Sequence, residues 1–197
     1  MARKVDPERH EQRRLAIIDA GLTCFAELGY DGATTARICR QAGIGSGTFF
    51  HYFPTKAALL LAILDYGTRE TSTWFAAQTG RSDAAQVVRD WVRHTADDVT
   101  DPRVPGFVRA VGAVMTEPDV AVALAADDDA QRRNLRLWIR RAQQAGEVRT
   151  DVSAPALTSW VMLILDGFLG RLATETTFSA AGQRRMLLDT IDRLLAT

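Results

Sequence analysis

The sequence is poor in cysteine and proline and has no net charge, and the cysteine shortage excludes two classes of protein. Its 197 residues include 2 cysteines and 6 prolines, and 24 basic residues balance 24 acidic ones. Cys24 and Cys39 have neither a C-x-x-C spacing nor a histidine at zinc-ligand intervals, so the sequence indicates no disulfide framework and no metal site. We expect both thiols to be buried and reduced. The balanced charge points to no particular partner.

Long apolar runs are also absent. The longest is WVMLIL at 160–165, far shorter than the about 20 residues that cross a bilayer. No apolar segment follows the charged N-terminus as it would in a signal peptide. We therefore expect a cytoplasmic protein that does not interact with a membrane. The first fourteen residues mix Arg3, Lys4, Arg9, Arg13 and Arg14 with three acidic residues, which is typical of a solvated helix start.

Apolar residues recur at intervals of three and four along nearly the whole chain, which predicts an all-α fold. A first helix fits Glu8 to Leu28 and is stopped by Gly29. Thr34 is a suitable cap for a short helix to Ala42, and Thr55 for a long one that reaches the Gly80 region. The remaining expected helices begin at Ser46, at Ser82 or Asp83, and within the segments 106–116, 118–145, 153–175 and 179–197.

The segment GIGSGTFFHYFPTK at 43–56 carries the main functional signal. Its alternating glycines do not form a dinucleotide-binding loop, because a helix rather than a strand precedes them. A helix, a short glycine-containing turn and a second short helix instead match a helix-turn-helix. Phe49 and Phe53, at positions i and i+4, are expected to face inward. The residues expected to face DNA are Ser46, Gly47, Thr48, Phe50, His51 and Tyr52, with Lys56 near a phosphate.

The run AIIDAGLTCFAELGYDGATTARICRQAGIGSGTFFHYFPTKAALL resembles the DNA-binding domain of TetR-type transcriptional regulators. This resemblance implies a helix-turn-helix domain over 1–56 and a helical ligand-binding and dimerisation domain over 57–197. It implies a homodimer on a palindromic double-stranded DNA operator, with Thr34, Thr35 or Arg37 near phosphate. Unlike many relatives, this chain has no basic residue in its Gly45–Ser46 tip and has Phe50 where a tyrosine is common.

Two helices are candidates for the dimer interface. The helix at 153–175 is apolar on most of its sides, so more than one neighbour must cover it. Together with the last helix it could form half of an intermolecular four-helix bundle, although its own chain could also cover it. The candidate interface residues are Leu157, Trp160, Val161, Ile164, Phe168, Leu187, Ile191 and Leu194.

The resemblance also implies a pocket for an unidentified small ligand, expected to be hydrophobic or aromatic. Candidates are the aromatic and polar exceptions among the apolar stripes: Trp74, Trp91, His94, Phe107, Met115, Trp138, Met162 and Asp166. For each of them taken singly, a place in the core is the favoured interpretation, and Asp166 is the best exception. Asp166, which follows an apolar run, could serve a ligand, a partner chain or a local cap.

No catalytic arrangement, cofactor motif or metal-ligand spacing is present in the sequence. The triplet at 127–129 consists of adjacent helical residues that diverge by about 100° each, so we interpret it as a solvated patch. The sequence predicts a ligand-responsive repressor that is not an enzyme. A ligand-independent or activating regulator of the same fold is the alternative, and a solid core would favour it.

Overall fold

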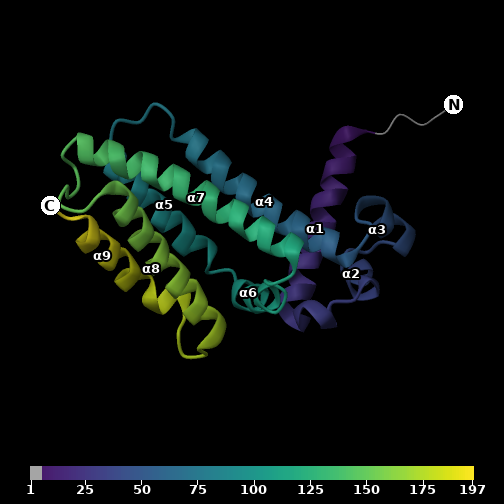
Figure 1. Ribbon diagram of the computed structural model, residues 1–197. Helices are drawn as coiled ribbons and strands as arrows, with labels where there is room; N and C mark the ends of the chain where they lie inside the picture. Colours follow the sequence, from purple (N-terminus) through teal and green to yellow (C-terminus); the bar gives the residue numbers. More distant parts are fainter. Residues whose placement is uncertain (1–5) are drawn as a thin grey trace.

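The computed structural model describes residues 6–197, and within them all regular secondary structure is helical. Figure 1 shows an elongated molecule with α2 and α3 at one end and the C-terminus at the other. The helices are α1 (Pro7–Gly32), α2 (Thr35–Gln41), α3 (Ser46–Tyr52), α4 (Lys56–Ala77), α5 (Ala84–Asp98), α6 (Val104–Gly112), α7 (Pro118–Gln144), α8 (Ala154–Thr174) and α9 (Ala180–Leu195). The predicted all-α fold is confirmed.

The ends of the short N-terminal helices follow from local chemistry. Gly29 interrupts α1 with a φ of 70°, a conformation that favours glycine. The hydroxyl of Thr34 caps α2 by accepting a hydrogen bond from the amide of Arg37 at 3.3 Å. Gly43 ends the segment with a φ of 62°, and α3 ends before Pro54. These local signals account for the agreement between the predicted and observed boundaries.

The N-terminal core extends beyond the first three helices. Ile17, Phe25, Ile38 and Phe49 pack in it, and so do buried residues of α4, α6 and α7. Leu59 and Leu60 of α4 are completely buried there. The first turns of α4 therefore complete the core that holds α2 and α3. The domain boundary after residue 56 stays a prediction.

The C-terminal core is formed by α5, α7, α8 and α9, with Phe75 from the end of α4. In Figure 1, α4 runs beside α7, and α8 and α9 lie side by side at the end that holds the C-terminus. The short helix α6 joins the two halves because it packs against both α1 and α8. This core corrects half of the dimer prediction. Four candidate interface residues, Leu157, Val161, Leu187 and Ile191, are buried within their own chain and cannot contact a partner directly.

Helix α8 is long and apolar enough to cross a membrane by length and composition, which the six-residue run WVMLIL did not suggest. Its buried residues, among them Leu157, Val161 and Leu165, pack within the C-terminal core. Core helices of globular domains often have such a composition. Trp160 and Leu163, by contrast, are 53% and 56% exposed. The chain therefore covers one side of α8 and leaves an apolar strip on the other.

Candidate nucleic-acid interface

Helix α3 presents an apolar face to the core and a polar and aromatic face to solvent. Phe49 and Phe53 are 0% and 4% exposed, which confirms that they face inward, whereas Phe50 is 52% exposed. Ser46, Gly47 and His51 are also exposed, and Thr48 and Tyr52 are half-buried. The six predicted DNA-facing residues of α3 thus lie at or near the surface. A helix with this exposure can enter the major groove without unfolding its own core.

Packing within the chain does not explain the glycine at position 47. A Cβ atom added to Gly47 would meet no other atom within 4 Å. Since the backbone φ at Gly47 is not positive either, neither space nor conformation within the chain requires glycine. A neighbour outside the chain, such as the DNA backbone, is a sufficient reason for a missing side chain.

The three residues predicted to contact phosphate at the start of α2 differ in exposure and in the hydrogen bonds that they already form. Thr34 is exposed, but its hydroxyl already accepts the capping hydrogen bond, and Thr35 is half-buried. Arg37 is exposed, and its Nη1 donates to the carbonyl oxygen of Gly32 at 3.2 Å. A guanidinium carries five N–H donors. Arg37 therefore keeps donors that can reach a phosphate.

Lys56 connects α4 to the end of α1. Its Nζ donates a hydrogen bond to the carbonyl oxygen of Tyr30 at 2.6 Å and lies 4.1 Å from the centre of the Tyr30 ring. The half-buried ammonium thus forms both a charge-assisted hydrogen bond and a cation–π contact. This role was not predicted from the sequence. Two of its three N–H donors remain for the predicted contact with DNA.

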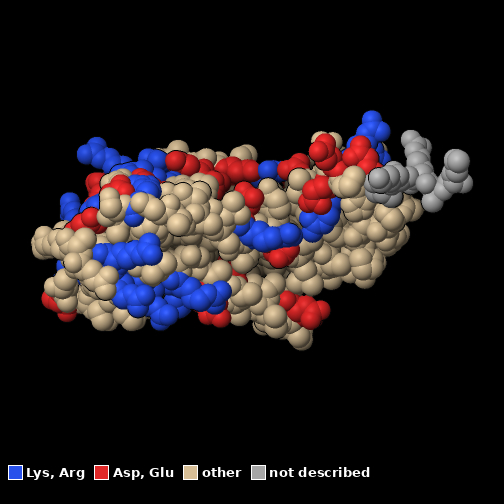
Figure 2. Space-filling view, turned by 90° about the horizontal axis from the view of Figure 1, so that it is seen from above, with Lys and Arg blue, Asp and Glu red and all other residues tan. Residues whose placement is uncertain are grey.

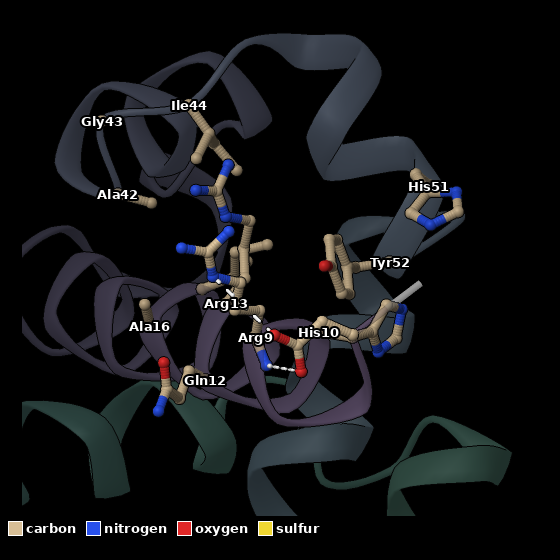
Figure 3. A pocket seen from close by; sticks show the side chains of 12 residues that line it. Arg9, His10, Gln12, Arg13, Ala16, Ala42, Gly43, Ile44, His51 and Tyr52 are labelled. Carbon is tan, nitrogen blue, oxygen red and sulfur yellow. Dashed lines mark hydrogen bonds and ion pairs between the residues drawn. The ribbon is translucent and has the colours of Figure 1, made fainter. Parts of the chain in front are cut away.

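Two basic residues that the sequence analysis assigned to a solvated helix start lie beside the recognition helix. Figure 3 shows Arg9 and Arg13 of α1 bordering a hollow with Ile44 of the turn and with His51 and Tyr52 of α3. The hollow has a volume of about 1000 Å³. The side chain of Arg9 is 80% exposed, and its Nε lies 3.8 Å from Oδ2 of Asp6. These arginines can supply the cations that the Gly45–Ser46 tip lacks.

The ring of His10 helps to position this end of α1. It lies 4.6 Å from the Tyr52 ring and 6.0 Å from the His51 ring, measured between centroids. Spacing along the sequence could not reveal this neighbourhood, because about forty residues separate α1 from α3. Arg3 and Lys4 lie outside the described residues. Figure 2 shows one face of the molecule, on which blue side chains are most numerous away from the helix-turn-helix end.

A second site lies in the middle of the molecule. A cavity of about 780 Å³ is lined by residues of α1, α4, α5, α6 and α7 and by the loop after α5. Three of the predicted ligand residues line it: Trp91, His94 and Phe107. Trp74 does not line it, but its ring stacks on His94 with 5.6 Å between the centroids and 7° between the planes.

The other four predicted ligand residues lie elsewhere. Trp138 and Met162 are 3% and 5% exposed and belong to the C-terminal core, and Met115 is 54% exposed outside the cavity. Asp166 is an exposed residue beside a separate hollow of about 90 Å³. Partial desolvation raises the pKa of Asp166, repulsion from Asp128 adds to the rise, and Arg132 opposes it. None of these four residues lines the central cavity, and their part in ligand binding stays a prediction.

The cavity wall contains polar atoms that lack partners. Trp91 is 4% exposed, and neither its Nε1 nor the Oγ1 of Thr95 forms a hydrogen bond with any described residue. Both residues line the cavity. A buried donor without a partner costs about 1–3 kcal/mol, so such atoms beside an open volume are suited to a bound molecule.

Family models match both halves of the chain. Residues 17–63 match "Bacterial regulatory proteins, tetR family", and residues 80–196 match "BetI-type transcriptional repressor, C-terminal". The chain belongs to the TetR family. The expectation drawn from the helix-turn-helix residues is therefore confirmed, and this TetR-family protein is a DNA-binding transcriptional regulator.

The chain is similar in sequence to two transcriptional repressors over most of their length. The TetR-family protein is 34% identical over 181 residues to the HTH-type transcriptional repressor Rv1474c of Mycobacterium tuberculosis, covering 87% of this chain and 88% of the relative. It is 32% identical over 171 residues to the HTH-type transcriptional repressor AcnR of Corynebacterium jeikeium, covering 86% of each chain.

Solved structures share the fold. A TetR transcription regulator from Haloarcula marismortui has a TM-score of 0.81 at 19% identity, covering 94% of this chain and 97% of that one. The SmeT–triclosan complex has a TM-score of 0.79 at 18% identity, covering 94% and 92%. At these identities the likeness extends to the fold of the TetR-family protein and not to its ligand.

In this TetR-family protein, α4 contributes to both sites. Its first residue, Lys56, contacts Tyr30 near the helix-turn-helix, and Ile63, Gly67 and Thr71 line the cavity. A single continuous helix therefore connects the cavity wall with the DNA-binding domain.

Proposed function

We propose that this chain is a homodimeric repressor that binds a palindromic operator and is released when a small molecule enters the central cavity. The observation that carries the proposal is the position of that cavity. It lies against α4, the helix whose first turns complete the core of the DNA-binding domain. The names of the matched relatives, which are transcriptional repressors, support the sign of the regulation.

The proposed DNA contacts divide into two groups. The α3 residues Thr48, Phe50, His51 and Tyr52 face the base edges, and Phe50 offers an apolar contact to a thymine methyl group. The residues proposed to hold phosphate groups are Thr34, Thr35, Arg37, Ser46, Lys56, Arg9 and Arg13. In this assignment the α1 arginines replace the missing cation of the recognition-helix tip.

The proposed dimer interface is the exposed strip of α8 together with α9. Trp160 and Leu163 of α8 and Met186 of α9 are 53%, 56% and 65% exposed. Ile164, Phe168 and Leu194 are half-buried at the edge of the core. Gly167 and Gly170 on α8 have nothing within 4 Å of an added Cβ, so a partner helix can approach closely. Such a strip, apolar and uncovered, suits a two-fold helix pair.

Release follows from a difference in affinity between two states. The ligand must bind the cavity more tightly when the two recognition helices are wrongly spaced for DNA. Half-sites lie about 34–36 Å apart, one turn of DNA, so a small pivot of α4 is enough to spoil the fit. A coupling of about 1–3 kcal/mol is typical.

The cavity favours this mechanism over a ligand-independent or activating regulator, because that alternative requires no cavity in the C-terminal domain. SmeT, which has the same fold, has been solved as a complex with the small molecule triclosan. We propose no enzymatic role. As an operator-binding protein it would act in the cytoplasm.

Selection of bound sequences from a random DNA pool tests the DNA-binding part of the proposal. The expected result is a palindrome whose half-site centres are about 10 base pairs, or a multiple of that, apart. Enrichment of an asymmetric single site would contradict a symmetric dimer. Arg13→Ala should lower the affinity for every selected sequence similarly, since phosphate contacts carry no sequence information.

A further inference from the structure

The central cavity is lined by acidic residues and by no basic side chain other than histidine. Five carboxylates border it: Glu70, Asp97, Asp98, Asp101 and Asp127. Among the residues that the structure describes, no Lys or Arg lines it. These negative charges surround a partly enclosed volume and repel one another. Their neutralisation therefore depends on positively charged side chains outside the cavity.

Arginines from outside the cavity balance two of these carboxylates. Asp97 accepts a hydrogen bond from Nε of Arg184 at 2.7 Å. The carboxylate of Asp101 accepts three hydrogen bonds from Nε and Nη2 of Arg103. Each arginine holds the pKa of its carboxyl below the usual value. Asp97 and Asp101 are thus ionised and already paired.

The other three carboxylates form no ion pair with an arginine or lysine in the described part of the chain. Asp127 accepts from the hydroxyl of Thr68 at 2.8 Å and from the amide of Gln131 at 2.7 Å, both neutral donors. Asp98 lies 3.4 Å from His94. Glu70 forms no ion pair with any described residue. The cavity therefore has negative charge that no arginine or lysine among residues 6–197 neutralises.

The pKa of the Asp98 carboxyl reflects the excess of negative charge in the cavity. Burial raises the pKa of the Asp98 carboxyl, and the neighbouring carboxylates of Asp97 and Glu70 raise it further, against the attraction of His94. A cation placed among these groups would relieve both the repulsion and the desolvation of the charged form.

Aromatic rings complete the wall. Tyr66, Trp91 and Phe107 line the cavity, and the Trp74–His94 stack lies behind it. The faces of aromatic rings attract cations, tryptophan most strongly. The Nε1 of the buried Trp91 and the hydroxyl of Thr95 also need partners. The first is a donor only, so it requires an acceptor.

We propose that the cavity binds an organic cation, a protonated or quaternary amine with an aromatic or apolar body and a hydrogen-bond acceptor. The cationic centre lies among Glu70, Asp98 and Asp127, the body contacts the aromatic wall, and the acceptor meets Nε1 of Trp91. This inference rests on the proposed function and specifies the chemistry of its ligand. Anionic molecules of the same size are excluded by the same carboxylates.

A matched set of ligands tests the charge directly. We would titrate the full-length protein, without DNA, by calorimetry with (3-hydroxyphenyl)trimethylammonium, with its neutral isostere 3-tert-butylphenol and with 3-hydroxybenzenesulfonate. The three molecules differ chiefly in charge. The cation should bind at least about tenfold more tightly than the neutral isostere, and the sulfonate should bind most weakly.

Glu70→Gln tests whether Glu70 provides the preference for the cation over its neutral isostere. Because Glu70 is exposed and has no ion-pair partner, this change should leave the fold intact while lowering the cation-to-neutral ratio by about three- to tenfold. Asp65→Asn is the matched control, since Asp65 lies on the same helix but does not line the cavity. It should leave the ratio unchanged.

Trp91→Phe tests the hydrogen bond separately. The ratio of affinities for the hydroxylated cation and for phenyltrimethylammonium, which lacks the hydroxyl, should fall toward one, because only the first uses Nε1. Comparing two ligands on one variant removes any general change in packing.

Equal binding of the cation and its neutral isostere, tighter binding of the sulfonate, or no binding of the cation at millimolar concentration would overturn the inference. Each of these results concerns the ligand alone. A neutral molecule that bound the cavity and released DNA would leave the proposed repressor function standing. Failure of a bound cation to weaken operator binding would count against that function and not against the cation site.

Discussion

The contact between α1 and α6 gives a prediction whose size can be worked out from the structure. Gly106 of α6 packs on the backbone of α1, so that a Cβ added there would lie 2.1 Å from the carbonyl oxygen of Ala26 and 2.8 Å from its carbon. A carbon and a carbonyl oxygen normally stay about 3.3 Å or more apart. Gly106→Ala must therefore move α6 away from α1 by about 1 Å.

The expected cost follows from two opposing effects. Overpacking of this kind costs about 1–3 kcal/mol, and a rigid backbone neighbour places the cost toward the upper end. Replacing glycine by alanine within a helix returns up to about 1 kcal/mol. The net loss is about 1–2 kcal/mol. In a chain of this size each kcal/mol shifts Tm by about 2–4 °C, so Tm should fall by about 2–8 °C.

Thermal unfolding at a fixed protomer concentration measures this loss, since the proposed dimerisation would make Tm depend on concentration. Gly112→Ala is the matched control. Gly112 is in the same helix, and an added Cβ there meets nothing within 4 Å, so its Tm should stay the same or rise. If Gly106→Ala melted at or above the temperature of Gly112→Ala, the close contact between α1 and α6 would be refuted.

Three further predictions concern the two interfaces. Ser46→Lys should strengthen DNA binding mainly without regard to sequence and steepen the salt dependence by about one phosphate contact; an unchanged slope in a salt titration would remove Ser46 from the interface. Lys56→Ala should weaken binding to all sequences about equally and lower the free energy of unfolding by about 1–3 kcal/mol, because the bond to the Tyr30 carbonyl is lost; a marked change of base preference in the selected DNA would contradict the phosphate role. Leu163→Glu should shift the dimer toward monomer in sedimentation equilibrium, whereas Leu28→Glu, at an exposed apolar residue of the other domain, should not; equal dimer stability in both variants would exclude the α8 strip.

Helix ends were predictable where the capping chemistry is local. Thr34, Thr55, Ser153 and Ser179 were each expected to begin a helix, and the hydroxyl of each accepts a backbone hydrogen bond from the first turn. The start of α5 shows the limit of this reasoning. Its cap residue is Asp83, one of the two expected residues, but the Asp83 carboxylate binds Arg81 and caps no amide.

One amide at the start of α5 has a partner far along the chain. Oε2 of Glu147 accepts a hydrogen bond from the amide of Ala85 at 2.7 Å, across 62 residues of sequence. No local pattern could indicate this partner. The same reason explains why the sequence missed Arg9 and Arg13 beside α3, since only the tertiary arrangement brings the first turns of α1 to the recognition helix.

Periodicity located the apolar helix α8 but not the side that the chain covers. Leu157 and Val161 proved to be core residues, and Trp160 and Leu163 exposed ones. All four were apolar, so their types alone could not distinguish the two sides. Only some of the ligand candidates line the central cavity, for a related reason. Aromatic residues were weighted equally, and yet Trp138 fills the core whereas Trp91 borders the cavity.

The most direct test of the central claim is the dissociation constant for the selected operator with and without a cavity-binding molecule. We would measure it by fluorescence anisotropy of labelled DNA at constant ionic strength. The account predicts that a saturating ligand raises the dissociation constant by about 5- to 150-fold. It predicts in return that operator DNA lowers the affinity for the ligand by the same factor. An operator affinity that did not change at saturation would contradict the account.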